Sequence, residues 1–220
     1  GNYVLDENGQ KIVIGHECDG KLSLGAGTLD DPGDRKILGN SLASLQYGLT
    51  FSFDWLGFDV SAFFQGTGNH YWYPAGMNYA FWGPYSYSYV SFIPRDFYTK
   101  MCWSEEHPDA YFPRPRAYSS TGGELSKVNS RYLQNLRYLR FKNLTVGYTI
   151  PESLTKKIRV DHIRVYFSGE NLCYWSPLKK VTKYLDPESA YTRYSTSANA
   201  RDHYAYPWQK TYMFGIDITF

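Results

Sequence analysis

A strictly alternating stretch, KTYMFGIDITF, occupies residues 210–220 and decides the fold. One side of an extended chain there carries the apolar residues Tyr212, Phe214, Ile216, Ile218 and Phe220. The other side is mostly polar or small, as expected of a strand with one face in an apolar environment. A length of about eleven residues is what a tilted strand needs to cross the hydrocarbon layer of a bilayer. The last strand of a soluble β-sandwich would show the same period, so the other segments have to decide between the two.

Two earlier segments, residues 46–55 and 58–64, alternate in the same way. Only Leu56 and Gly57 separate them. A two-residue connection that contains glycine is typical of a β-hairpin. The sequence therefore predicts two antiparallel strands joined by a tight turn.

Two later strands are predicted over residues 138–150 and 162–170. In the first of them the apolar phase changes near Lys142 and Asn143, which indicates a β-bulge. Pro151 ends this strand, because proline cannot donate to a sheet ladder. With the final strand, the sequence predicts an all-β, antiparallel arrangement of about five strands.

The connections between these strands alternate in length. They are short at residues 56–57 and 152–160, and long at residues 66–136 and 172–209. A compact soluble domain rarely contains such long loops. Outer-membrane β-barrels have this asymmetry, with short periplasmic turns and long extracellular loops. We therefore expect residues 1–45 to be a loop and lead-in segment, and residues 46–220 to supply transmembrane barrel strands with long extracellular loops.

The composition agrees with strands and loops and excludes some classes of function. Aromatic residues make up 19% of the 220 residues, with 22 tyrosines, and the formal net charge is only +2. No block of like charges suggests a nucleic-acid partner. No run of 18 or more apolar residues predicts a transmembrane helix. A mean hydropathy of -0.48 is compatible with a barrel, which presents its lipid face in alternate residues.

No catalytic constellation stands out, so we do not expect an enzyme. The five histidines are scattered, and neither an H-E-x-x-H pair nor a G-x-S-x-G elbow is present. Three cysteines give no disulfide framework. We expect no cofactor. Asp30, Asp31 and Asp34 could offer oxygen ligands to Ca²⁺, but their spacing is more typical of a turn.

The first long loop is dense in aromatic rings and is the best candidate for recognition of a ligand or partner. The candidates are Tyr71, Trp72, Tyr73, Trp82 and Tyr85. Flat rings bury a large area at little entropic cost and can stack on sugars or pack against peptide side chains. The alternative is that the rings pack the loop onto itself or against a lid protein, because a large loop must bury something to be ordered.

Several motifs resemble the carboxy-terminal part of the barrel of a SusC/RagA-type TonB-dependent outer-membrane transporter. They lie at residues 34–41 (DRKILGNS), 57–66 (GFDVSAFFQG), 138–144 (YLRFKNL), 164–172 (RVYFSGENL) and 186–188 (DPE). Transporters of this kind are closed barrels of about 22 strands with a plug domain, far more than 220 residues supply. The resemblance therefore implies a terminal piece of a barrel, without its plug.

The resemblance also implies a function and partners. The protein would import bulky nutrients, oligosaccharides or peptides, across the outer membrane of a Gram-negative bacterium. Its partners would be a SusD-like surface lipoprotein, TonB through the missing N-terminal part, the remainder of the barrel chain and membrane lipids. Gly215, Ile218 and Phe220 resemble the signal read by the barrel-assembly machinery. Two alternatives stay open: a soluble extracellular carbohydrate-binding β-sandwich, and a β-rich hydrolase that uses carboxylates such as Asp109 and Glu124.

The alternation predicts which side chains face lipid and which face the lumen. Those predicted to face lipid are Leu49, Phe51, Phe53, Val165, Phe167, Phe214, Ile216 and Ile218. Those predicted to face the lumen are Arg164, Ser168, Asp217 and Thr219. We further expect the last strand to pair with the strand at residues 162–170 and, on its other side, with a strand absent from this sequence.

Overall fold

The computed structural model describes residues 4–5, 11–12, 25–26, 28, 30–31, 33–34, 36–87, 96–182, 184–190 and 208–220. The chain divides into two compact units, Gly1–Gly39 and Asn40–Phe220, so the predicted lead-in segment spans their boundary. In the first unit, β1 (Val4–Leu5) pairs antiparallel with β2 (Lys11–Ile12).

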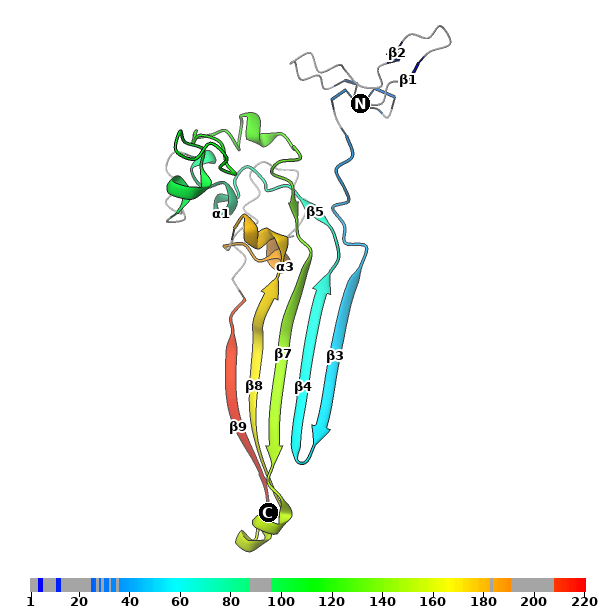
Figure 1. Ribbon diagram of the computed structural model, residues 1–220, viewed down its shortest axis with the longest axis vertical. Coiled ribbons are helices and arrows are strands. Elements are labelled where there is room, and N and C mark those ends of the chain that lie inside the picture. The colour runs from blue at the N-terminus through cyan, green and yellow to red at the C-terminus, as the bar shows by residue number, and fades with distance from the viewer. Residues whose placement is uncertain are drawn as a thin grey trace. The chain divides into compact units, whose positions relative to one another are not determined.

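The second unit is built on a five-stranded antiparallel sheet with the order β3-β4-β7-β8-β9 (Figure 1). The strands are β3 (Gln46–Trp55), β4 (Phe58–Thr67), β7 (Tyr138–Thr149), β8 (His162–Trp175) and β9 (Thr211–Thr219). The predicted hairpin is confirmed: β3 and β4 pair from Gln46–Thr67 to Trp55–Phe58. Leu56 and Gly57 both have positive φ, 47° and 85°, as a tight hairpin turn requires.

The predicted β-bulge in β7 is also confirmed. Phe63 of β4 pairs with Asn143, whereas Phe64 pairs with Phe141, so Lys142 is the extra residue. The bulge reverses the apolar phase of β7 and so keeps Phe141 on the same face of the sheet as Leu144. The extra residue therefore explains why the alternation of the sequence changes phase at this point while the apolar side chains of β7 stay on one face of the sheet.

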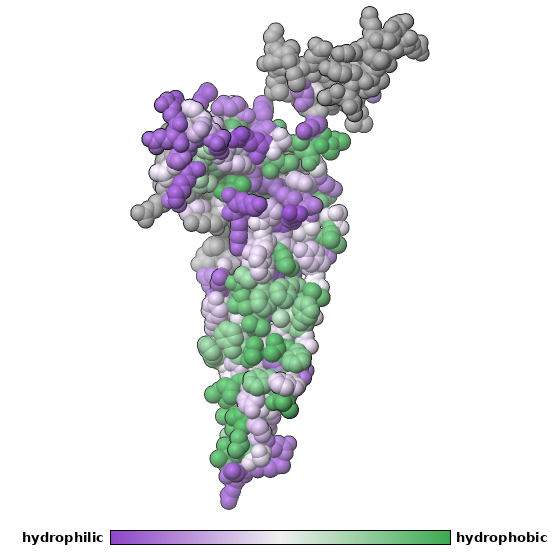
Figure 2. Space-filling model, viewed as in Figure 1, coloured by the Kyte–Doolittle hydropathy of each residue, from purple (hydrophilic) through white to green (hydrophobic). Residues whose placement is uncertain are grey.

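The two faces of the sheet differ sharply. The apolar face carries Leu49, Phe51, Phe53, Val60, Val146, Val165, Phe167, Phe214, Ile216 and Ile218. The polar face carries Thr50, Ser52, Asp59, Gln65, Thr145, Arg164, Ser168, Asp217 and Thr219. Figure 2 shows hydrophobic surface along the strands and hydrophilic surface over the loops above them. The predicted partition of side chains between the two faces is confirmed.

The pairing of the last strand is confirmed on one side. β9 pairs with β8 from His162–Thr219 to Glu170–Thr211. Within the described residues, no strand pairs with the second edge of β9 or with the outer edge of β3. Both edges therefore keep a row of backbone groups for further strands.

Short connections lie at one end of the sheet and long ones at the other (Figure 1). The β7–β8 connection holds α2 (Glu152–Thr155) and a 3-10 turn, Lys156–Ile158. The long β4–β7 connection holds β5 (Tyr71–Trp72), α1 (Tyr79–Trp82), short turns at Gly83–Tyr85, Phe97–Met101 and Glu124–Ser126, and β6 (Gln134–Asn135), which pairs with β5. The long β8–β9 connection holds a 3-10 turn, Pro177–Lys180, and α3 (Pro187–Ala190).

The hydrophobic core lies in the long loops and not between layers of sheet. Its buried residues include Phe81, Trp82, Tyr85, Phe97, Phe112, Leu125, Tyr132, Leu136 and Leu178. None of the helices in the described residues is long and apolar enough to cross a membrane.

Candidate ligand-binding site

An aromatic cluster organises the first long loop. We use this name for Phe81, Trp82, Tyr85, Phe97, Phe112 and Tyr132, all of them buried. The ring centroids of Trp82 and Tyr132 lie 5.4 Å apart in a T-shaped arrangement, and those of Phe112 and Tyr132 lie 5.9 Å apart and stacked. Edge-to-face and offset contacts of this kind add to the stability that ring burial alone provides.

Local sequence signals set the rings of the cluster in place. The Asn78 side chain accepts a hydrogen bond from the Phe81 amide at 3.0 Å and so caps α1. The Trp82 indole donates to the Pro74 carbonyl at 3.1 Å, and the Tyr85 hydroxyl donates to the Pro113 carbonyl. Each polar atom of these rings thus has a partner where water is excluded, which burial requires.

The structure separates the five predicted recognition residues into two groups. Trp82 and Tyr85 are 0% exposed and serve as the centre of the loop's own packing. This burial favours the alternative that these two rings pack the loop onto itself. Tyr71, Trp72 and Tyr73 are half-buried. The Tyr73 hydroxyl donates to the Leu125 carbonyl at 2.8 Å.

Burial favours the neutral form of three phenols and one thiol in this loop. Desolvation raises the pKa of Tyr73, Tyr111 and Tyr132 above the ordinary tyrosine range. Burial likewise raises the pKa of the Cys102 thiol. Cys102 and Cys173 are both free, so no disulfide joins the first long connection to β8 through them. Charged side chains such as Lys100 and Arg116 lie exposed on the loop instead, in ion pairs with Asp96 and Glu124.

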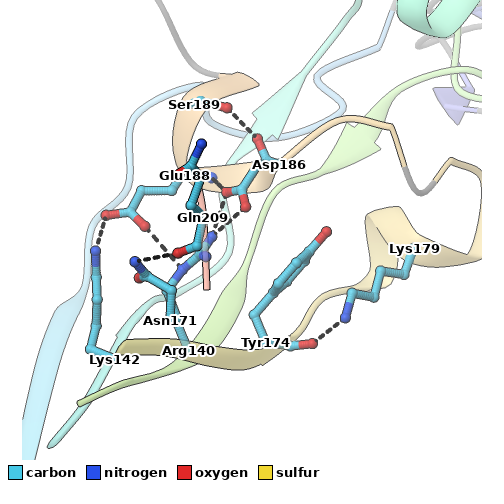
Figure 3. A network of polar contacts seen from close by, with 9 residues as sticks. All are labelled: Arg140, Lys142, Asn171, Tyr174, Lys179, Asp186, Glu188, Ser189 and Gln209. Atoms are coloured by element: carbon cyan, nitrogen blue, oxygen red, sulfur yellow. Dashed lines mark hydrogen bonds and ion pairs between the residues drawn. The ribbon is translucent and has the colours of Figure 1, made fainter. Parts of the chain in front are cut away.

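A buried ionic network ties the second long connection to the sheet (Figure 3). Arg140 of β7, with a side chain 2% exposed, directs Nη2 at both carboxylate oxygens of Asp186, at 2.5 Å each. Its Nε lies 3.1 Å from Glu188 Oε2, an ionic contact that lacks the alignment of a hydrogen bond. Lys142 Nζ donates to Glu188 Oε1 at 3.1 Å.

This network fixes α3 against the polar face of the sheet. Asp186 precedes α3 and Glu188 lies within it, whereas both cations project from β7. Aromatic rings cover the cations: the Arg140 guanidinium lies 4.9 Å from the Tyr174 ring centroid, and Lys142 Nζ lies 4.3 Å from that of Trp208. A buried charge is retained only when it is paired. The network therefore sets the position of the loop above the polar face.

Beside α3, the polar face contains a pocket of about 820 Å³. Side chains that line it include Gln46, Phe63, Gln65, His70, Tyr138 and Glu188. The two glutamine amides offer donors and acceptors, the aromatic rings offer flat apolar area, and Glu188 brings one carboxylate. This combination can recognise peptide groups or sugar hydroxyls, since a few polar groups in a part-aromatic cavity fix a ligand's orientation.

A second ionic group lies on the polar face near the short turns. Arg164 holds Asp59 with two parallel hydrogen bonds, Nε to Oδ1 at 2.9 Å and Nη2 to Oδ2 at 2.6 Å. Its Nη1 reaches Asp217 at 3.2 Å. Gly147 leaves room for this fork, because a Cβ there would come within 2.3 Å of Asp59 Oδ1. These three charges satisfy one another on the polar face, as predicted for Arg164 and Asp217.

The remaining predicted sites stay predictions. Gly215 lies in β9 opposite Tyr166, whose ring would collide with a Cβ at position 215. Ile218 and Phe220 are both exposed. Asp31 Oδ2 accepts a hydrogen bond from the Ala26 amide at 2.8 Å, a turn contact. In the part of the chain that the structure describes, no three His, Cys, Asp or Glu side chains gather as metal ligands.

Sequence reasoning missed the residues that build the pocket and its ionic frame. Arg140, Asp186 and Glu188 occurred in the motifs but received no role. The signal that could have found them is the cost of a charge within a membrane strand, because Arg140 and Lys142 each need an acidic partner from elsewhere in the chain. Gln46 and Gln65 could have been found as amide side chains in the polar phase of the hairpin.

Comparison with known proteins agrees with this architecture. No protein-family model matches the chain. Two curated proteins of Formosa agariphila are similar to it: TonB-dependent receptor P26, 26% identical over 195 residues, and TonB-dependent receptor P3, 28% identical over 192 residues. Both alignments cover 85% of this chain, but only 18% and 17% of those proteins. The chain thus spans less than a fifth of the curated relatives' length.

Solved structures of a RagAB peptide importer show the same fold. The "closed-closed" state matches with a TM-score of 0.58 and 19% identity, over 99% of this chain and 21% of that chain. The "open-open" state gives the same TM-score over 93% of this chain and 20% of that one. These likenesses confirm the predicted antiparallel barrel architecture and the resemblance to SusC/RagA-type TonB-dependent transporters. By name, the relatives are receptors and importers and not enzymes.

Proposed function

We propose that this chain is the carboxy-terminal part of a TonB-dependent outer-membrane transporter that imports bulky nutrients, oligosaccharides or peptides, to the periplasm. The observation that carries the proposal is the contrast between the two faces of the sheet. Its apolar face exposes large side chains such as Phe53 (59%), Phe214 (84%) and Ile216 (63%), while its polar face holds paired charges. Such a sheet suits lipid on one side and a water-filled lumen on the other.

The position of the loops supports import of a large solute. Both long connections lie at one end of the sheet (Figure 1), and the ionic network holds α3 over the polar face. We infer that this end is extracellular and that the short turns are periplasmic. A SusD-like lipoprotein would cover the extracellular loops, and TonB would act through protein that precedes this chain. The location would be the outer membrane of a Gram-negative bacterium, as the names of the relatives suggest.

Within the barrel, we propose that the pocket beside α3 is a substrate subsite. Gln46 and Gln65 come from the β3–β4 hairpin, whereas Glu188 comes from the loop that the Arg140 network holds. The pocket therefore joins a fixed wall to a loop-borne carboxylate. Amide side chains suit both peptide backbones and sugar hydroxyls. Glu188 is already paired with Lys142 and Arg140, so it shapes the wall without favouring a cationic solute.

The test uses the full-length protein, with the plug and all strands, in detergent. Two probes are compared by calorimetry: a mixture of short oligopeptides and a mixture of oligosaccharides. The variant Gln46→Ala with Gln65→Ala is expected to lose affinity for one of them by roughly tenfold, because each lost hydrogen bond contributes about 0.5–1.5 kcal/mol. The matched control is Thr50→Ala with Ser52→Ala, also on the polar face of β3.

The outcomes separate the parts of the proposal. A loss confined to the glutamine variant assigns the pocket as a subsite. Unchanged affinity in both variants removes the subsite but leaves the transporter. If cells that carry the full-length protein take up neither class of probe in a TonB-dependent manner, the transporter proposal itself fails.

Neither alternative function gains support. A soluble β-sandwich would cover its apolar face with a second sheet, yet Phe51 and Phe214 are 55% and 84% exposed. The carboxylates considered for a hydrolase do not form a pair of catalytic type: Asp109 is exposed, and Glu124 lies 3.6 Å from Arg116 in an exposed ion pair. Extraction gives a direct check, since a barrel requires detergent and a sandwich does not.

A further inference from the structure

Phe63 of β4 is an exception to the division between the two faces of the sheet. Side chains alternate along a strand, so Phe63 shares the polar face with Asp59 and Gln65. Every other phenylalanine of the five described strands lies on the apolar face: Phe51, Phe53, Phe58, Phe64, Phe141, Phe167 and Phe214. Phe63 is half-buried and lines the pocket beside α3. An apolar ring in a polar lumen is stabilised when a solute packs against it.

Gly48 of β3 makes room for this ring. Gly48 pairs with Gln65 and so lies diagonally across from Phe63, which pairs with Thr50. A Cβ at position 48 would come within 3.2 Å of Cε2 of the Phe63 ring. Because glycine has no side chain, the ring leans across β3 close to the backbone and still borders the pocket.

Three amide side chains lie near the ring on the same face. Gln65 follows Phe63 by two residues on β4, Gln46 precedes Gly48 by two residues on β3, and both line the pocket. Asn143 of β7 pairs directly with Phe63, which brings their side chains within reach of one another. In the part of the chain that the structure describes, none of the three amide groups has a hydrogen-bond partner. Their donors and acceptors are therefore open to a solute.

The charges around the ring limit the kind of solute. Glu188 in the pocket wall is already paired with Arg140 and Lys142. Among the described residues that line the pocket there is no lysine or arginine. Glu170 of β8 pairs in register with Asn143, and within the described residues it has no ion pair. A carboxylate accepts hydrogen bonds from hydroxyl groups and repels acidic ones, so an acidic solute is disfavoured.

A sugar ring fits this arrangement better than a peptide does. One face of a pyranose presents C–H groups that pack on an aromatic ring, and its hydroxyls project outward, where amides can donate and accept. An extended peptide binds a sheet through an open strand edge. Phe63, however, lies on β4, whose two edges are paired with β3 and β7. The backbone beneath the ring is therefore closed to a peptide.

We propose that Phe63 is a stacking platform for an uncharged sugar unit, whose hydroxyls bind the amides of Gln46, Gln65 and Asn143. The sugar covers the phenyl ring, which explains why an apolar side chain occupies the polar face. The inference rests on the proposed function, and it names the substrate class of the subsite as neutral oligosaccharides.

The test measures binding to the full-length protein in detergent by calorimetry. The probes are neutral gluco-, manno-, xylo- and galacto-oligosaccharides, oligosaccharides of uronic acids, and a mixture of short oligopeptides. Phe63→Leu keeps an apolar side chain but removes the flat ring, so affinity for a neutral oligosaccharide should fall roughly tenfold or more. Phe63→Tyr keeps the ring and should bind as the unaltered protein does. The matched control is Phe64→Leu, the same change one residue away on the apolar face, which should also leave binding unchanged.

A second pair of variants tests the amides without altering the ring. Asn143→Ala should weaken binding of the same oligosaccharide severalfold, whereas Thr145→Ala, at the next polar-face position of β7, should not. The unfolding temperature of each variant, compared with that of the unaltered protein, separates a loss of contact from a loss of fold.

Several results would overturn the inference. They are unchanged sugar binding by Phe63→Leu and Asn143→Ala, an equal loss in Phe64→Leu, and tighter binding of uronic-acid oligosaccharides than of every neutral one. Binding of oligopeptides without any sugar overturns the inference and leaves the transporter. If the protein binds neither class and cells take up neither in a TonB-dependent manner, the proposed function itself fails.

Discussion

The sheet and the aromatic cluster use the same kinds of side chain in opposite ways. On the sheet, Phe53 and Phe214 are 59% and 84% exposed, whereas Phe81 and Phe97 in the loop are 3% and 1% exposed. The difference lies in the solvent that each region meets. In the proposed barrel, the strands present their apolar residues to lipid and obtain their order from backbone pairing, whereas the loop meets water and must build a core of its own. Aromatic content alone therefore says little about what a segment does.

The largest loss of stability is expected from a substitution in the core of the first long loop, because no neighbouring side chain can fill the space that a removed ring leaves. Trp82→Ala removes a fully buried ring and should destabilise the closed loop by about 3–5 kcal/mol. Protease cleavage between β4 and β7 in the full-length protein should accelerate by roughly a hundredfold or more, because cleavage follows the population of the open loop. The temperature at which the barrel unfolds, measured by gel electrophoresis of heated samples, should not change.

The matched control for this variant lies on the sheet. Trp55→Ala, at a tryptophan 61% exposed at the end of β3, should leave the cleavage rate of the loop unchanged. If Trp55→Ala opens the loop as much as Trp82→Ala does, the loop has no independent core and the contrast between the two regions is lost.

The next effect is expected on the apolar face. Val146 lies between Val60 and Phe167 in the sheet, and Val146→Arg would place a charge against lipid at a cost of about 2–4 kcal/mol near mid-depth. Thr145→Arg, one residue away on the polar face, is the control and should cost far less. Reversible unfolding of the full-length protein in lipid vesicles measures both. Equal losses would mean that the two faces do not meet different solvents.

A smaller effect is expected from alkaline pH, and only in the loop. Burial raises the pKa of Tyr132 above its ordinary value of 10.0, so the folded loop keeps a proton that the open loop releases. The stability that this phenol contributes is complete below pH 10.0 and declines as the pH rises through the folded pKa. Protease cleavage of the loop should therefore rise at alkaline pH, before the sheet unfolds.

Two phenylalanine variants test the origin of that alkaline opening. Tyr132→Phe removes the ionisable group with little change of packing and should move the opening to higher pH. Tyr118→Phe, at an exposed tyrosine, should leave it where it was. An opening that neither variant moves would assign the effect to other groups of the loop.

The same contrast explains how much the sequence could predict. Strand positions, the hairpin at Leu56–Gly57, the bulge at Lys142 and the β8–β9 pairing all follow from alternation, because a strand between lipid and lumen keeps a period of two at every residue. Local patterns are sufficient where the environment of each face is uniform along the whole strand.

The loop and the pocket could not be predicted in this way. A tyrosine that packs inward and one that binds a ligand look alike in sequence, so the sequence alone does not reveal that Tyr85 is buried. Arg140 and Asp186 are 46 residues apart, and no local period connects them. Partnerships of this kind depend on where a long connection folds back, which only the three-dimensional arrangement determines.

The smallest effect on stability is expected at the exposed ion pair between Lys156 and Glu152. Its length is almost that of the buried pair between Arg140 and Asp186. Lys156 Nζ lies 2.6 Å from Glu152 Oε2, and this distance is close to the 2.5 Å between Arg140 and Asp186. The side chains of Lys156 and Glu152, however, are both more than 70% exposed. The Lys156 hydrogen bond lowers the pKa of Glu152, so any stabilisation is present above the ordinary pKa of 4.5 and lost as the pH falls through the folded pKa.

Solvent and salt screen this exposed pair, so its length says little about its strength. We expect Glu152→Gln to leave the unfolding midpoint of the full-length protein unchanged at neutral pH and in acid, in low and in high salt. Glu105→Gln, at another exposed carboxylate, provides the baseline for loss of one negative charge. A salt-dependent loss that is specific to Glu152→Gln would show that the short turn depends on its ion pair, and that exposure is not what separates the two networks.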